Sequence, residues 1–123
     1  MNEKHILYGL VALLVIIAAI LWSGVFTPSK YNSFAQCLTN KSVKMYGAWW
    51  CPHCKNQKEA FGSSWKFVNY IECSSADGNH QLPVCDAAGI SGYPTWVFPD
   101  GTNASGEVNF TTLSQKSGCP LPE

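Results

Sequence analysis

Residues 45–58 read MYGAWWCPHCKNQK, and this stretch decides the fold. Its apolar first half predicts a short strand over Met45–Trp50, and its second half predicts a helix that begins at Cys51. Cys51 and Cys54 then lie three positions apart in the first helical turn, where they can close a small disulfide ring. The free backbone N–H groups and the positive dipole end of a helix N-terminus favour a thiolate at the first cysteine. The stretch therefore predicts a site of thiol–disulfide exchange.

The two residues between the cysteines fit this interpretation. Pro52 is tolerated in the first turn because its missing N–H would have no partner there. His53, when protonated, would place a positive charge beside the sulfur of Cys51. Such a charge stabilises the reduced form and makes the disulfide a stronger oxidant. The alternative is that His53 is an exposed helix residue without a role.

A CxxC pair can also be half of a zinc site or an inert structural disulfide. A zinc site usually needs a second close pair of Cys or His residues. Cys73 and Cys85 are twelve positions apart, and His80 stands alone between them. We therefore expect no resident metal.

The composition limits the class of protein. The chain has 123 residues, 13% of them charged, and a formal net charge of zero. All of its positive side chains are lysines, with no basic run, so we expect no nucleic-acid partner. Six cysteines in so short a chain indicate an oxidising compartment.

Residues 6–26 form a nearly uncharged run, ILYGLVALLVIIAAILWSGVF. As a helix the run would span about 31 Å, close to the thickness of a bilayer core. It predicts a single-pass anchor in the cell membrane after a cytoplasmic segment 1–5. A cleaved signal peptide is the alternative, but Leu21 and Trp22 are bulky where a cleavage site needs small residues. Either way, we expect the linker 27–31 and the domain 32–123 outside the cytoplasm.

The rest of the chain alternates between helix and strand patterns. We expect an α/β fold with a central mixed four-stranded sheet flanked by helices, in which alternating strands pair in parallel and a final hairpin adds an antiparallel edge. Gly62 and the serines after it weaken the helix that carries the cysteines. Helices are predicted over 32–39, 51–67, 83–88 and about 112–117, the last capped by Thr111 or Thr112, and further strands over 69–73, 95–98 and 106–110.

This order of elements, the CPHC sequence and the segment Gly92–Thr95 before the third strand resemble a thioredoxin-like domain. More narrowly, the chain is similar to the thioredoxin-like domain fused to, or encoded beside, bacterial and archaeal homologues of vitamin K epoxide reductase. The resemblance covers about Phe34–Cys119. The segments that carry the narrower resemblance are Met45–Ala48, Gln57–Lys58, Phe61–Gly62, Tyr70, Cys73 and Ile90–Trp96.

The resemblance assigns roles to residues of the site. It implies that Cys51 is the exposed nucleophile and Cys54 the more buried resolving thiol. It also implies that Pro94 is a cis-proline packed beside the disulfide, and that the backbone of Tyr93 binds an extended substrate segment. An ordinary edge-strand proline is the alternative for Pro94. We expect Trp50 to shield one side of the disulfide.

One position departs from the family pattern. Thioredoxins carry a buried acidic residue six positions before the first cysteine, and this chain has Met45 there. Proton transfer to the resolving thiol must then use water, Glu59 or another route. We expect Glu59 to be a solvated helix residue paired with Lys55.

The resemblance also supports a structural bridge between Cys73 and Cys85, the alternative being a second redox pair. Cys37 and Cys119 remain. A bridge between them would tie the first helix of the domain to the C-terminal tail. Either could instead be free or pair with another chain.

Together these features predict an enzyme, a membrane-anchored extracytoplasmic thiol–disulfide oxidoreductase. It would pass electrons from reduced client proteins to a membrane partner that resembles vitamin K epoxide reductase. No cofactor is expected in the chain, and a quinone would act only through the partner. The alternatives are a disulfide reductase or isomerase, a metal-delivery module using Cys51, His53 and Cys54, and a non-catalytic adaptor.

Overall fold

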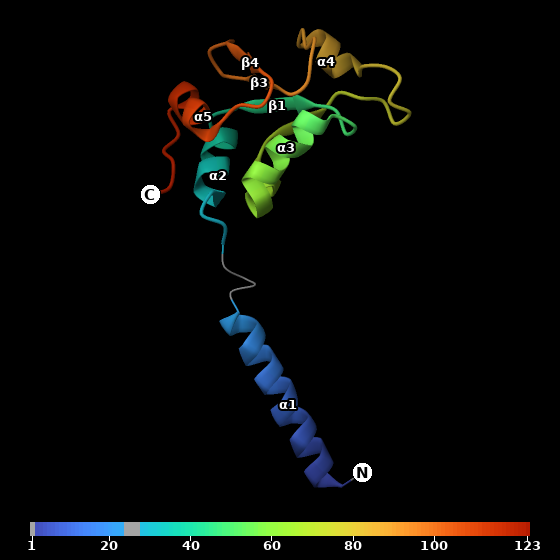
Figure 1. Ribbon diagram of the computed structural model, residues 1–123, viewed down its shortest axis with the longest axis vertical. Helices are drawn as coiled ribbons and strands as arrows, with labels where there is room; N and C mark the ends of the chain where they lie inside the picture. Colours follow the sequence, from blue (N-terminus) through green and yellow to red (C-terminus); the bar gives the residue numbers. More distant parts are fainter. Residues whose placement is uncertain (1, 24–27) are drawn as a thin grey trace.

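The computed structural model describes residues 2–23 and 28–123. Its first helix, α1 (Glu3–Trp22), has a mean hydropathy of 2.5 and no buried residue. In Figure 1 it stands apart from the other elements. It begins three residues before the predicted span 6–26, and residues 24–26 of that span lie outside the described residues. Its 20 residues measure about 30 Å, so α1 is long and apolar enough to cross a membrane.

After α1, the chain forms a domain with one four-stranded sheet in the order β2-β1-β3-β4, so the predicted fold class is confirmed. The first two strands are parallel, with Met45 beside Tyr70, while β3 is antiparallel to both β1 and β4. The strands are β1 (Lys44–Gly47), β2 (Tyr70–Glu72), β3 (Thr95–Val97) and β4 (Asn103–Ser105).

The prediction of parallel pairing was right for β1 and β2 and wrong for β3. The chain doubles back where β2 ends, because Ser74 bridges to Gln81 and the N–H of Leu82 donates to the carbonyl of Cys73 at 2.7 Å. The next helix is only five residues long, about 8 Å, and does not return the chain to the start of the sheet. The third strand therefore enters beside the end of β1 and runs in the opposite direction.

The helices largely follow the predicted ranges. The exception is the long helix predicted over 51–67, which ends at Phe61 and continues as a 3₁₀ helix. The reason is Gly62, whose φ of 55° is a conformation that glycine adopts at little cost. The helices of the domain are α2 (Asn32–Asn40), α3 (Pro52–Phe61), η1 (Gly62–Phe67), α4 (Pro83–Ala87) and α5 (Phe110–Ser117).

The last strand and the last cap differ from the prediction. The strand expected over 106–110 lies earlier, at Asn103–Ser105, because the turn after β3 is tight: Asp100 accepts a hydrogen bond from the N–H of Thr102 at 2.9 Å. Pairing with β3 therefore begins at Asn103. The final helix is capped by Asn109, whose side chain accepts from the N–H of Thr112 at 2.8 Å, and not by a threonine.

The two faces of the sheet bury different clusters, as the two-residue repeat of a strand requires. Met45 and Trp96 face the larger cluster, which includes residues of α2, α3 and α5. Tyr46 faces the smaller cluster, with Cys85 of α4. In Figure 1, α2 and α3 lie on one side of the sheet and α4 on the other. The helix that carries the CPHC sequence thus packs on the larger core.

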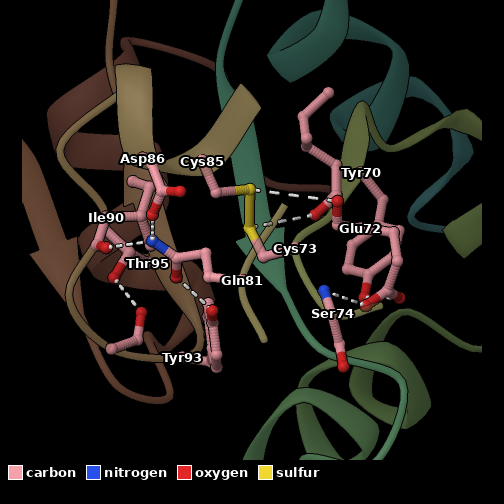
Figure 2. Close-up of a disulfide and its surroundings, with 12 residues drawn as sticks. Tyr70, Glu72, Cys73, Ser74, Gln81, Cys85, Asp86, Ile90, Tyr93 and Thr95 are labelled. Carbon is pink, nitrogen blue, oxygen red and sulfur yellow. Dashed lines mark hydrogen bonds between the residues drawn. A yellow bond between two sulfur atoms is a disulfide. The ribbon is translucent and has the colours of Figure 1, made fainter. Parts of the chain in front are cut away.

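Four cysteines form two disulfides. Cys37 of α2 is bonded to Cys119 in the C-terminal tail, with 5.8 Å between their Cα atoms. Cys73 after β2 is bonded to Cys85 of α4, with 5.6 Å between their Cα atoms (Figure 2). These are the two structural pairings considered from the sequence. They leave the two cysteines of the CPHC sequence as free thiols.

We predict that the disulfides differ in their effect on stability. The bridge between Cys37 and Cys119 closes a separation of 82 residues, and the one between Cys73 and Cys85 a separation of 12. On the chain-entropy model, replacing the first pair by serine lowers the free energy of unfolding by between about 4 and 5 kcal/mol, and replacing the second by about 3 kcal/mol. Urea unfolding of the full chain in detergent micelles measures both. An equal or smaller loss for the longer bridge would contradict the prediction.

Candidate active site

The predicted strand and helix are both present, but the strand ends at Gly47, three residues before the predicted end at Trp50, and a turn leads to the helix, which begins at Pro52. Cys51 is the N-cap residue of α3, and its Sγ accepts a hydrogen bond from the N–H of Cys54 at 3.2 Å. The N–H of Cys51 donates to the carbonyl of Ala48 at 3.1 Å, which fixes the turn after β1. Pro52 is the first residue of the helix, where no N–H is needed. The first sulfur thus occupies the position of a helix-capping acceptor, which suits a thiolate.

Cys54 is buried, as predicted, but Cys51 is more buried than predicted. Cys51 exposes 5% of its surface and Cys54 exposes 1%, so Cys51 is the more accessible but is not an exposed residue. The reason is that both belong to the larger core cluster. Burial, and next the hydrogen bond with Cys51, raise the pKa of Cys54 to about 12. The second thiol therefore stays protonated at neutral pH unless a nearby group takes its proton.

His53 has a partner that the sequence analysis did not identify. Its Nδ1 lies 2.7 Å from Oε1 of Glu107, and Nδ2 of Asn56 donates to the same oxygen at 2.9 Å. These bonds hold the pKa of Glu107 below its usual range. Glu107 lies between β4 and α5, in the range predicted as a strand. The exposed imidazole is thus oriented by a carboxylate that is remote in sequence.

Gln57 is a second residue of the site that sequence reasoning gave no role. Its side chain is buried; Nε2 donates to the carbonyl of Val108 at 3.1 Å, and Oε1 accepts from the N–H of Val108 at 2.7 Å. The indole of Trp96 donates to Oε1 as well, at 3.3 Å. Since these bonds join α3 to β3 and to the segment before α5, they fix the helix that carries the thiols.

The proline segment has the cis peptide bond that the resemblance implies. The peptide bond between Tyr93 and Pro94 is cis, and Pro94 is fully buried. The ring of Tyr93 meets that of Trp50 edge-on, with 5.9 Å between the centroids, and the indole of Trp50 donates to Oγ of Ser74 at 2.8 Å. Trp50 is thereby fixed beside the loop that precedes α4. A pocket of about 160 Å³ lies here, lined by Trp50, Ser74, Gly78, Asn79, His80, Gln81 and Tyr93.

Tyr70 of β2 lies close to the second thiol, since a Cβ on Gly47 would contact both side chains, and Glu72 of the same strand is its hydrogen-bond partner. The hydroxyl of Tyr70 donates to Oε2 of Glu72 at 2.7 Å (Figure 2). Glu72 Oε1 also accepts from the backbone N–H groups of Trp49, at 3.1 Å, and Ser74, at 2.9 Å. Burial, and next the bond to the Glu72 carboxylate, raise the pKa of Tyr70 above its ordinary value. Neither residue was assigned a role from the sequence.

Glu59 has the position that the sequence predicted. Its carboxylate lies 3.9 Å from Nζ of Lys55, one turn away on α3, and both side chains are largely exposed. Such an exposed pair contributes little to stability. The interpretation of Glu59 as a solvated helix residue is confirmed, so the proton of Cys54 needs another route.

The structure shows no candidate metal site in residues 2–23 and 28–123. No group of three or more His, Cys, Asp and Glu side chains there is arranged to hold a metal ion. The chemistry that the site offers lies in its two thiols, which can form one disulfide and carry two electrons.

Comparison with known proteins agrees with this geometry. The thioredoxin family matches residues 24–116. A protein of Arabidopsis thaliana named thiol-disulfide oxidoreductase LTO1 is 39% identical over 95 residues, which are 74% of this chain and 25% of that protein. A probable protein disulfide-isomerase ER-60 of Schistosoma mansoni is 31% identical over 88 residues, 68% of this chain and 18% of that protein. The chain spans a quarter or less of these relatives. With its mixed sheet, its CPHC helix and its cis-proline, the chain belongs to the thioredoxin family.

Proposed function

We propose that this chain is a membrane-tethered, extracytoplasmic oxidoreductase that oxidises thiols of client proteins with the Cys51–Cys54 disulfide. One observation carries the proposal. The two free thiols are the pair at the N-terminus of α3, while the other four cysteines are held in disulfides. The redox chemistry is thereby confined to one pair.

The cycle needs only the two sulfurs. A client thiolate attacks Sγ of Cys51, the bond between Cys51 and Cys54 breaks, and Cys54 leaves with the electron pair and takes up a proton. A second client thiolate then attacks the client sulfur of the mixed disulfide and releases Cys51 as a thiolate. The client leaves with a disulfide, and the site is left as a dithiol. No cofactor in the chain is required.

The substrate segment would bind beside the cis-proline. The backbone of Tyr93 precedes the cis bond and would pair with an extended client segment, as the resemblance implies. Trp50 is half exposed and packs edge-on against the same tyrosine, so its indole would cover one side of the bound cysteine. The pocket between Trp50 and Tyr93 has room for a client side chain next to that cysteine.

Reoxidation would use a membrane partner that resembles vitamin K epoxide reductase and passes the electrons to a quinone. The support for this partner is the narrower sequence resemblance. The apolar, unburied α1 supports a membrane location. Anchoring the domain beside its partner would raise the effective concentration of the dithiol there.

A disulfide isomerase or reductase is the second candidate. It is favoured by the relatives named protein disulfide isomerases, including a protein disulfide isomerase-like 2-1 of Oryza sativa subsp. japonica that is 37% identical over 65 residues. The chemistry at Cys51 is the same, but a reductase reverses the net electron flow and an isomerase transfers no net electrons. The reduction potential separates the two candidates.

We expect the reduction potential of the Cys51–Cys54 pair to lie nearer to the value of about −120 mV of a strong oxidant than to the value of about −270 mV of thioredoxin. The physical reason is that the capping position and His53 both stabilise the reduced form. Equilibration of the full chain with glutathione redox buffers, read by mass after alkylation, measures it. A potential near that of thioredoxin would favour the reductase.

Replacing His53 by alanine should lower this potential by about 10 to 30 mV, because the imidazolium no longer stabilises the reduced form and 30 mV corresponds to about 1.4 kcal/mol. The effect is small because the side chain is 70% exposed and solvent screens its charge. Lys55→Ala is the matched control. It also removes a cation from α3, but one that is paired with Glu59. An unchanged or higher potential in His53→Ala would contradict the role of the histidine.

Replacing Cys54 by alanine should convert the transient mixed disulfide into a stable one. Cys51 can still attack a disulfide, but no second thiol resolves the product. Membranes that contain the variant, separated on non-reducing gels, should show adducts that last for hours and disappear on reduction. The control is the variant that also carries Cys51→Ala. Adducts of equal abundance in that control, or none with Cys54→Ala, would contradict the proposal.

A further inference from the structure

The second thiol lacks the proton partner that thioredoxins place in the core. Met45 occupies that position and is fully buried. Its neighbour in the parallel register of β2 is Tyr70, on the same face of the sheet as α3. A buried thiol that must lose and regain a proton in each cycle therefore has a tyrosine hydroxyl near it instead of a carboxylate.

A glycine brings the tyrosine close to the thiol. A Cβ on Gly47 would lie 3.0 Å from Sγ of Cys54, 2.9 Å from Cε2 of Tyr70 and 3.3 Å from the hydroxyl of Tyr70. The sulfur and the phenol oxygen thus converge on the space that a side chain at this position would fill. Because these three contacts are so short, we expect that only glycine at position 47 lets the tyrosine and the thiol approach each other.

The hydroxyl has an acceptor on its far side. It donates to Oε2 of Glu72, while Oε1 of the same carboxylate is held by two backbone N–H groups. The three bonds fix the carboxylate, and Glu72 remains partly exposed to solvent. A phenol oxygen that donates its own proton can still accept another. The phenol and the carboxylate therefore form a hydrogen-bonded pair that reaches from beside the buried sulfur to partly exposed surface.

We propose that Tyr70 and Glu72 carry the proton of Cys54 during thiol–disulfide exchange. As the S–H proton of Cys54 passes to the oxygen of Tyr70, the hydroxyl proton of Tyr70 passes to the carboxylate of Glu72 and from there to solvent. The thiolate of Cys54 attacks Sγ of Cys51 in the mixed disulfide, and the partner sulfur leaves as a thiolate. When a client attacks the oxidised site, the same protons move in reverse. The inference rests on the proposed exchange at Cys51.

The other charged and titratable groups near the thiol are consistent with this route. Nζ of Lys58 lies 4.1 Å from the centroid of the Tyr70 ring, one turn after Cys54 on α3. Its charge favours a thiolate at Cys54, as the Coulombic effect on the pKa of that thiol indicates. Cys51 is the other titratable group there and acts in the opposite direction. Lys58 can thus stabilise the transient negative charge, but as an ammonium it cannot accept the proton.

The test separates the two steps of exchange. The reduced full chain in detergent micelles is mixed with oxidised glutathione and quenched with acid at short times. Intact mass then follows the glutathione adduct as it forms on Cys51 and as Cys54 resolves it. Tyr70→Phe keeps the ring, and Glu72→Gln keeps an oxygen for the backbone bonds. Both should form the adduct at the wild-type rate.

Resolution should slow about 10- to 100-fold at pH 7 in both variants, which is at or below the lower end of the roughly 100- to 10,000-fold contribution of a general acid–base group, because water can take over part of the transfer. The deficit should shrink toward pH 10, where hydroxide takes the proton directly. Tyr46→Phe is the matched control, because this tyrosine is on the neighbouring strand but faces the smaller core cluster. It should resolve the adduct at the wild-type rate.

Three outcomes would overturn the inference in different ways. Resolution at the wild-type rate in Tyr70→Phe would contradict the proton route alone. A deficit of equal size from pH 6 to pH 10 would assign Tyr70 a packing role and contradict the route as well. A wild-type chain that forms no adduct on Cys51 would contradict the proposed exchange chemistry and, with it, the route.

Discussion

The bond on which the site depends is the one from the backbone N–H of Cys54 to Sγ of Cys51, 3.2 Å long. It makes the first sulfur the capping acceptor of α3 and directs the positive end of the helix at it. The same geometry buries the second thiol and keeps it protonated. Two chemically identical side chains thus have different environments because of where a helix begins, and this difference is the basis of the roles proposed for them.

The remaining structure holds that helix end in place. Gln57 ties α3 to β3 and to the segment before α5, and Glu107 from that segment holds the imidazole of His53. The Cys73–Cys85 disulfide fixes the loop whose Ser74 bonds Trp50. These contacts join elements far apart in sequence around one short pair of thiols. A rigid N-terminus of α3 would keep the sulfurs of Cys51 and Cys54 in a fixed geometry for exchange.

The parts of the fold that could be predicted are those with a local chemical cause. The CPHC junction, the apolar helix α1 and the proline-initiated α4 each follow from residues next to one another in sequence. The position of β4 and the antiparallel direction of β3 were predicted wrongly. Both depend on where the chain turns between strands, and the spacing of apolar residues does not show this. In the site, His53 was predictable because it lies between the cysteines. Glu107 was not, because it is 54 positions away from the imidazole that it binds.

The most direct test of this account is the reaction of the reduced full chain with iodoacetamide at pH 7, followed by peptide mass mapping of each cysteine. A thiolate at the helix cap predicts that Cys51 is alkylated at least about tenfold faster than glutathione under the same conditions, while Cys54 stays unmodified. Alkylation of Cys51 no faster than that of glutathione, or equal labelling of the two cysteines, would contradict it.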